Sequence, residues 1–428
     1  MTAAQPVATL RRVSAANRAP ARRYRALHLL PLVLAIGVAL WCMWPPPAPE
    51  RHPIKVFPDS PSYVDWGYGR PPVPFLFYAL VGSERGAVIA QTVLSCAAWG
   101  TLGWLALGLP GAVVALLLAA ALPVVLWNYT ILSESLALSL GAALLAATLA
   151  LGRRWSPARY AIWAFCLLMY TGVRAENFFL VPPLFAALLV WHRRHWRTLG
   201  AVGATAAALF VVFSVVLDKQ NRNWQIRMTN IVLTRVLPDA PLAHQFHTAG
   251  LPREPALLAA RGRMLAAYDP TFVAATPAFQ RWLDEHSRPM YLAWLRTLAP
   301  QRMLFQSMDH TLKHWPNAFN YYIAGVRLPG TAWDAYPISH AMQIEFARWL
   351  WLAAIPLASA LLTRRVVFGD LFVLAYLAAV YLMAFAVFHG DTGEMDRHMV
   401  LTATLYRFAP VAALAGVWER VRRLRRGA

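Results

Sequence analysis

The chain has 428 residues, of which 58% are hydrophobic and 14% are charged, and its mean hydropathy is +0.44. A water-soluble domain usually has about 25% charged residues, so this composition excludes an ordinary soluble fold. The formal net charge of +20 is of the size found in nucleic-acid-binding proteins, but the positions of the basic residues indicate another origin.

Long apolar runs divide the chain into candidate transmembrane helices, each near the roughly 17–25 residues that cross the hydrocarbon core. The predicted spans are 27–44, 86–107, 111–131, 133–151, 159–175, 177–191, 198–217, 347–363, 366–388 and 399–417. The sequence therefore predicts an all-α integral membrane protein of about ten transmembrane helices. The arginine-rich start could also mark a signal peptide, but the Pro45-Pro46-Pro47 step is a poor cleavage site, which favours a retained first helix.

Charge alternates between the short segments that join these spans. The segments on one side, including both termini, are rich in arginine, and Glu419 is their one acid; the short segments on the other side carry more acids than bases. The positive-inside rule places both termini in the cytoplasm, so the positive charge indicates topology and not nucleic-acid binding. The preference for arginine over lysine is typical of a G+C-rich bacterial genome, which suggests the bacterial inner membrane.

These features divide the chain into five parts. They are a basic cytoplasmic tail (1–26), a module of about seven spans (27–217) with a first outer loop (45–85), a large extracytoplasmic loop (218–346), three C-terminal spans (347–417) and a basic tail (418–428). The large loop is too long for a plain connector. Its Thr276-Pro277 step is typical of a helix start, so we expect short, partly amphipathic helices over the outer face of the bundle.

The first outer loop carries several polar residues between its prolines. Asp59-Ser60 is followed by Tyr63, Asp65 and Arg70-Pro71-Pro72. The prolines keep the segment out of a long helix and define its turns. A carboxylate just above the membrane can act as a base or bind a cation, although Asp59 alone could simply cap a helix that starts near Pro61.

The other outer hairpins place more ionisable residues at the same level. They are Glu134 at the start of one span, Arg174 and Glu176 between two others, and Glu394, Arg397 and His398 before the last span. Any one of them could be a helix cap or an interfacial ion pair. Because ionisable groups at membrane depth are costly, their accumulation on one side predicts a functional site. Arg407 lies about 13 Å deeper and needs a carboxylate, a carbonyl or a wet cavity beside it.

This order of motifs resembles the GT-C superfamily of multispanning glycosyltransferases that use polyprenyl-phosphate-linked sugars, such as protein O-mannosyltransferases and the aminoarabinose transferase of lipid A. The resemblance rests on Asp59-Ser60 with Tyr63, on Arg70-Pro71-Pro72, on Ser133-Glu134, on Arg174 and on Glu394 with Arg397-His398. It covers the first six and last two predicted spans. The chain departs from the many relatives that have an acidic pair, because Asp59 is followed by Ser60.

The resemblance implies a sugar transfer on the extracytoplasmic face. Asp59 would be the base, and Arg397 and Arg174 would hold the departing phosphate, with His398 as a further candidate for this role. Glu134 and Glu394 would orient these arginines or bind sugar hydroxyls; Tyr63, Asp65, Arg70 and Glu176 complete the predicted substrate site. The partners implied are a polyprenyl-phosphate-sugar donor, a glycan, lipid or protein acceptor and membrane lipid.

No cofactor is assigned with certainty, but a divalent metal is possible. Asp391, Glu394 and Asp396 could hold a cation together with Asp59, whereas His310 and His314 lack a third ligand at a familiar spacing. Other functions stay open: a transporter or lipid flippase, an O-antigen-ligase-like transferase with catalytic basic residues in 218–346, or a catalytically silent scaffold. A transporter would be expected to carry several charges near the midplane and an inverted repeat.

Overall fold

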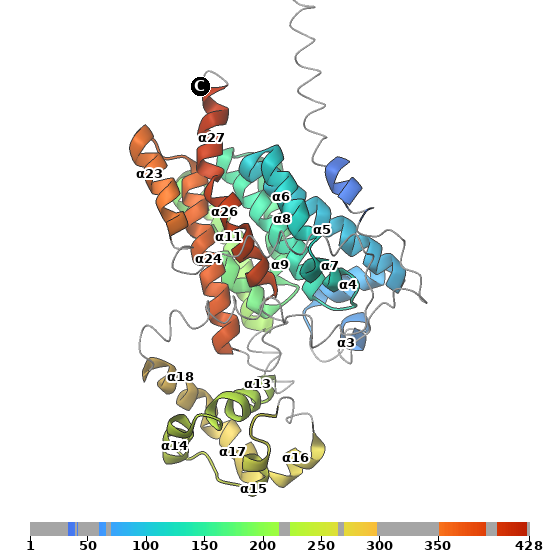
Figure 1. Cartoon of the computed structure of the whole chain (residues 1–428), viewed down its shortest axis with the longest axis vertical. Coiled ribbons are helices and arrows are strands. Elements are labelled where there is room, and N and C mark those ends of the chain that lie inside the picture. The colour runs from blue at the N-terminus through green and yellow to red at the C-terminus, as the bar shows by residue number, and fades with distance from the viewer. Residues whose placement is uncertain are drawn as a thin grey trace, which may run out of the picture.

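The computed structural model describes residues 33–38, 41, 60–65, 70–213, 223–263, 269–297, 351–390 and 400–425. All regular structure within these ranges is helical, with no strand among them. The helices form a bundle and, at one end of it, a smaller lobe of short helices (Figure 1). The prediction of an all-α chain is confirmed for the described residues.

Four helical stretches are long and apolar enough to cross a membrane. They are α5 (Glu84–Leu107), α8 (Glu134–Arg153), Phe368–His389 of α24 (Phe368–Gly390) and Val400–Leu424, which comprises α26 (Val400–Ala413) and α27 (Ala415–Leu424). A fifth is added if two helical segments bent by 107° are one span: Ala175–Trp191, which contains η1 (Ala175–Leu180) and α10 (Val181–Trp191), and Arg193–Val211, which contains η2 (Arg193–His195) and α11 (Trp196–Val211). Spans of this kind support a helical membrane protein, whereas the total of ten stays a prediction.

Shorter helices complete the bundle. The predicted span 111–131 is divided into α6 (Leu109–Ala119) and α7 (Leu122–Asn128), and the break falls at Ala120 and Ala121. The others are α9 (Pro157–Thr171), a short 3₁₀ turn (Trp351–Ala353) and α23 (Ala354–Thr363). Around the centre of the bundle, the rings of Trp99 and Tyr376 each lie against Phe408, with centroids 5.7 and 6.3 Å away.

The first outer loop is more helical than its prolines suggested. Ser60–Val64 forms α3, and Pro72–Val81 forms α4, a ten-residue apolar helix with proline in its first turn, where the missing N–H costs no helical bond. The Val73 amide donates to the carbonyl of Gly172 at 3.2 Å, which holds the start of α4 against the end of α9. The loop is therefore packed onto the bundle near Arg174.

The lobe is formed by seven short elements of the predicted large loop. They are α13 (Asn223–Ile231), η4 (Val232–Val236), α14 (Ala240–Thr248), α15 (Pro255–Ala259), α16 (Pro270–Ala275), α17 (Pro277–Glu285) and α18 (Ser287–Thr297). Helix α17 starts at Pro277, as predicted, but the Thr276 hydroxyl does not cap it. Instead Glu254 accepts from the Ala278 and Phe279 amides at 3.0 and 2.9 Å.

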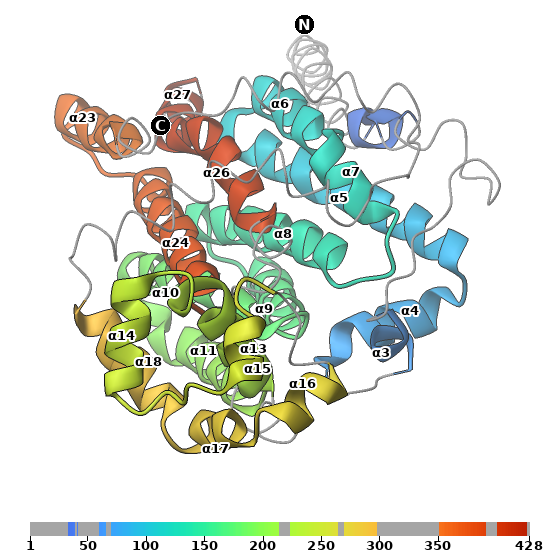
Figure 2. The ribbon, with the colours of Figure 1, turned by 60° about the horizontal axis from the view of Figure 1, so that its bottom comes forward.

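The lobe has its own apolar core and is bound to the end of α24. Phe246, Phe279 and Trp282 form part of the core. The Tyr291 hydroxyl donates to the carbonyl of His389 at 2.5 Å, and the Arg235 guanidinium lies 4.1 Å from the ring centroid of Phe388. Figure 2 shows α14 and α18 below the end of α24.

At the opposite end of the bundle, a bidentate ion pair joins α27 to the first turn of α24. The Arg420 Nη1 and Nη2 atoms donate to the two carboxylate oxygens of Asp370 at 2.8 and 2.6 Å. The Val367 amide donates to the same carboxylate at 2.9 Å, so Asp370 also caps its own helix. Both charged side chains are buried, and each supplies the other's counter-charge.

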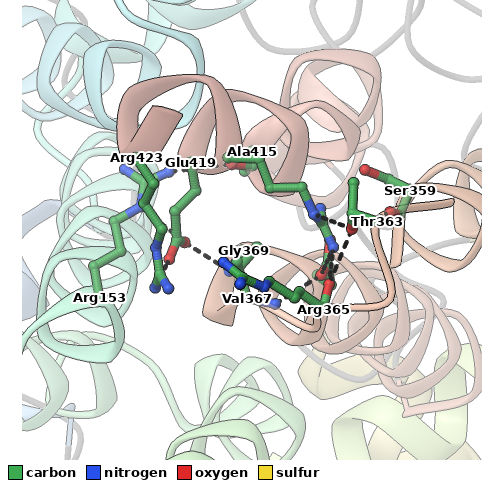
Figure 3. A network of polar contacts seen from close by, with 11 residues as sticks. Arg153, Ser359, Thr363, Arg365, Val367, Gly369, Ala415, Glu419 and Arg423 are labelled. Atoms are coloured by element: carbon green, nitrogen blue, oxygen red, sulfur yellow. Dashed lines mark hydrogen bonds and ion pairs between the residues drawn. The ribbon is translucent and has the colours of Figure 1, made fainter. Parts of the chain in front are cut away.

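Next to this pair, Glu419 connects three helices. It accepts from Arg153 at the end of α8 at 3.3 Å, from the Gly369 amide of α24 at 3.0 Å and from Arg423, one turn further along α27, at 2.7 Å. Figure 3 shows Glu419 between Arg153 and Arg423. The arginines and acids at this end therefore fasten the helices together, in addition to the topological role expected from the positive-inside rule.

Candidate functional site

A buried cluster of two carboxylates and one guanidinium lies at the start of α8. Arg174 Nη1 donates to Glu134 at 2.9 Å, while its Nε and Nη2 atoms lie 2.7 and 2.5 Å from one oxygen of Glu176. The side chains are 1% exposed for Glu134, 12% for Arg174 and 20% for Glu176. Of the predicted outer-side residues, these three are brought together by the fold.

Local structure holds each member of the cluster in position. Glu134 is the first residue of α8, where the positive end of the helix dipole favours a carboxylate. Arg174 directly precedes η1, after the turn at Gly172 that ends α9. The Asn177 side-chain amide donates to the carbonyl of Tyr170 at 2.9 Å and closes that turn. The turn thereby directs Arg174 toward α8.

The described part of the first outer loop lies beside this cluster. The Ser133 hydroxyl, next to Glu134 in the chain, donates to the Tyr63 hydroxyl at 3.3 Å. Arg70 donates to the Ser62 hydroxyl at 3.2 Å, and its guanidinium lies 4.8 Å from the centroid of the Tyr63 ring. Tyr63 and Arg70 therefore belong to the same neighbourhood as Glu134. Asp65, by contrast, is exposed and has no polar side-chain contact with any described residue.

A layer of polar side chains that the sequence analysis did not single out lies beneath the cluster. The Tyr78 hydroxyl donates to the carbonyl of Leu132 at 2.6 Å. The Gln91 amide lies between that hydroxyl, 2.8 Å away, and the carbonyl oxygen of Asn128, also 2.8 Å away. The Ser135 hydroxyl donates to the Asn128 side chain at 2.6 Å. Gln91 in the predicted span 86–107 and Asn128 in the span 111–131 were the available signals, because an amide side chain at membrane depth needs polar partners.

The cluster forms one wall of a small recess. Glu134, Arg174, Glu176 and Asn177 line it together with Met383 of α24 and with Val400 and Leu401, the first residues of α26. Four predicted site residues, Asp59, Glu394, Arg397 and His398, lie outside the described residues. Ser60, which directly follows Asp59 in the chain, is buried, and Val400 is two positions after His398. The described ends of both motif segments are thus found on this side of the bundle.

Two further predictions concern Arg407 and the residues that could hold a cation. Arg407 is fully buried in α26 and donates to the carbonyl of Ala403, one turn earlier, at 3.2 Å. Among the described residues, no group of three or more His, Cys, Asp and Glu could hold a metal ion. The proposed cation ligands Asp391 and Asp396, like His310 and His314, lie outside the described ranges.

Searches for similar proteins found no match among family models, curated proteins or solved structures. The functional argument therefore depends on the chemistry of these residues and on their arrangement.

Proposed function

We propose that the protein is a membrane glycosyltransferase of the GT-C type, which moves a sugar from a polyprenyl-phosphate donor to an acceptor on the extracytoplasmic face. The observation that carries the proposal is the convergence of separate motif segments at one end of the bundle. The ion cluster of Glu134, Arg174 and Glu176 lies beside Tyr63 of the first loop, and its recess is also lined by Val400 at the start of α26.

The reaction is a single displacement at the anomeric carbon. Asp59 takes the proton from the acceptor hydroxyl, the acceptor oxygen bonds to the anomeric carbon, and the bond from that carbon to the phosphate oxygen breaks with inversion. The leaving group is polyprenyl phosphate, whose negative charge needs nearby cations. Arg397, with His398 beside it, is assigned to this phosphate, since a guanidinium matches phosphate oxygens in a fork.

The geometry supports a different role for Arg174 from the phosphate contact that the sequence suggested. Its Nε, Nη1 and Nη2 atoms all contact the carboxylates of Glu134 and Glu176. A phosphate would have to displace one of these acids. We therefore assign Arg174 to positioning the two carboxylates, which would bind the hydroxyls of the sugar. The acceptor is a glycan, a lipid or a protein, and we assign its recognition to the lobe.

The proposal includes the topology of about ten spans, cytoplasmic termini and a bacterial inner-membrane location. Cysteine labelling of intact cells from either side of the membrane tests this part. A single cysteine at Ser83, ahead of α5, should react with an impermeant reagent from outside, and one at Ser156, ahead of α9, should not. The reverse pattern would contradict the proposed orientation.

The activity is tested in a deletion strain complemented with variants. Without the protein, a polyprenyl-linked sugar should accumulate and one glycan should lose a residue. Asp59→Asn should fail to restore transfer although it reaches the membrane at the wild-type level. The matched control is Glu84→Gln, which removes an exposed acid at the start of α5. Full transfer by Asp59→Asn would refute the assignment, and loss of transfer only with variants in 218–346 would favour an O-antigen-ligase-like enzyme.

A further inference from the structure

A second cavity lies at the far end of α8 from Glu134. It has a volume of about 420 Å³, within the roughly 300–1,000 Å³ range of small-ligand pockets. Its charged lining consists of one acid, Glu419, and five arginines from α8 and the turn after it, from α9 and from α27: Arg153, Arg154, Arg159, Arg422 and Arg423. The cavity is separate from the proposed transfer site.

The positive charge of this lining exceeds its negative charge by a wide margin. Glu419 is already shared between Arg153 and Arg423, and it also accepts the Gly369 amide. It is therefore not available to neutralise Arg154 and Arg159, which make no ion pair with a described residue. Like charges gathered from separate helices repel one another, so an anion in the cavity would lower the electrostatic energy.

Two of the arginines present hydrogen-bond donors to the cavity. Arg159 uses Nη1 to bind the carbonyls of Ala150 and Arg154 at 2.9 and 3.3 Å, which orients its guanidinium and leaves Nε and Nη2 uncommitted in the part of the chain that the structure describes. The Arg154 side chain is exposed and makes no polar contact with a described residue. A guanidinium oriented like that of Arg159, with the exposed guanidinium of Arg154 beside it in the cavity lining, suits the tetrahedral oxygens of a phosphate.

The position of the cavity relates it to the membrane surface. Arg153 is the last residue of α8, and Leu105 belongs to the last turn of α5, so the cavity lies where two candidate spans end. In a membrane crossed by these spans, the lipid headgroups would lie at this level. Leu105 and Ala150 add apolar wall beside the arginines, as the upper part of a lipid would require.

We propose that this cavity binds the phosphate of an anionic phospholipid headgroup. A net negative lipid such as phosphatidylglycerol is favoured over a zwitterionic lipid of the same size, because the choline of phosphatidylcholine would bring a cation against the arginines. The site does not depend on the proposed sugar transfer.

Native mass spectrometry of the full-length protein in a neutral detergent tests the proposal. Phosphatidylglycerol and phosphatidylcholine with the same acyl chains are offered in equal amounts, and retained lipid is counted. We expect selective retention of phosphatidylglycerol, and weaker binding by about fivefold for each arginine removed, or roughly 25-fold for R154Q/R423Q. The control R281Q/R296Q, which removes two exposed arginines of the lobe, should bind as the wild type does.

Three results would overturn the inference. One is equal retention of the two lipids by the wild type, and another is equal phosphatidylglycerol binding by R154Q/R423Q and the wild type. The third is complete displacement of the lipid by millimolar inorganic phosphate, which would indicate a site for a free phosphate. If R154Q/R423Q unfolds, R154Q alone replaces it, since that side chain has no polar contact to lose among the described residues.

Discussion

Arg174 donates to Glu134 over 2.9 Å, and this single contact joins the turn after α9 to the first residue of α8. The two residues are 40 positions apart in the chain. Because Glu134 is almost completely buried, the pair is both a structural connection and a way to hold a carboxylate at the edge of the recess. Stability and function are therefore expected to respond differently to changes at this contact.

Replacing Arg174 with Gln should destabilise the protein strongly. The change leaves Glu134 and Glu176 close together without their shared cation, and breaking a buried pair from one side costs about 3–5 kcal/mol. Thermal unfolding in detergent should show a clearly lower midpoint, whereas Arg281→Gln, at an exposed position in α17, should leave it unchanged. Glu134→Gln keeps the shape of the side chain and should cost less, near 1–2 kcal/mol. Equal midpoints for Arg174→Gln and the wild type would contradict this account.

The pair of Asp370 and Arg420 should show strong energetic coupling. Asp370→Asn removes the charge that binds both terminal nitrogens of Arg420, so the expected loss of stability is again about 3 kcal/mol. Arg420→Met should cost a similar amount, and the double variant should cost much less than the sum, because neither buried charge is then left alone. Denaturant unfolding of the two single variants and the double variant measures the coupling, and simple additivity would show that the contact contributes little.

Close packing of α5 on α6 predicts a sharp difference between two glycines. A methyl group at Gly103 would overlap the backbone carbonyl of Gly111, so Gly103→Ala must push the two helices apart and should cost about 1–3 kcal/mol. At Gly200 in α11, no heavy atom lies within 4 Å of the added carbon. Gly200→Ala should therefore be neutral or stabilise the helix by up to about 1 kcal/mol. Thermal unfolding of the two variants checks the difference, and similar effects would argue against the α5–α6 contact.

Attachment of the lobe to the bundle should weaken in alkaline solution. Burial raises the pKa of the Tyr291 hydroxyl from 10.0 to about 12, and Arg235 opposes this only in part. The folded state favours the neutral hydroxyl, which donates to the carbonyl of His389. Its contribution is fully present below pH 10 and is lost as the pH rises through about 12.

Tyr291→Phe provides the measurement for this pH dependence. The wild-type minus variant difference in tyrosinate absorbance should titrate near pH 12, above the ordinary tyrosine pKa of 10.0. At neutral pH the variant should lose about 1 kcal/mol, the net worth of one hydrogen bond. A difference titration centred at pH 10 would show that Tyr291 is exposed and that the lobe is not held at this point.

Three of the predicted long apolar runs coincide with helices long enough to cross a membrane, because continuous hydrophobicity determines where such a helix can lie. The expected spans 86–107, 133–151 and 366–388 correspond to α5 (Glu84–Leu107), α8 (Glu134–Arg153) and α24 (Phe368–Gly390) within a few residues. Shorter helices were harder to predict from the sequence. The stretch 72–81 lies in the predicted first outer loop (45–85), whose prolines argue against a long helix, yet packing against Gly172 stabilises it as α4.

The partners within the site could not be predicted from the sequence. The sequence predicts that Glu134, Arg174 and Glu176 share one side of the membrane, but the contact of Arg174 with Glu134 depends on how α8 and α9 pack. Asp370 lies within the predicted span 366–388, where the sequence does not identify its counter-charge, and the fold shows that Arg420 neutralises it. The polar layer of Tyr78 and Gln91 is not apparent from hydropathy averaged over a window of residues, because the apolar neighbours outweigh a single polar side chain.

Helix α24 is anchored at both of its ends. Asp370 in its first turn is held by Arg420, and the carbonyl of His389 in its last turn is held by Tyr291 of the lobe. Its 23 residues span about 35 Å without a break. Because α24 is one continuous helix held at both ends, a displacement at its arginine-rich end must either move the lobe or break one of these two contacts. The arginine-rich end of the bundle and the lobe are thereby placed under a common mechanical constraint.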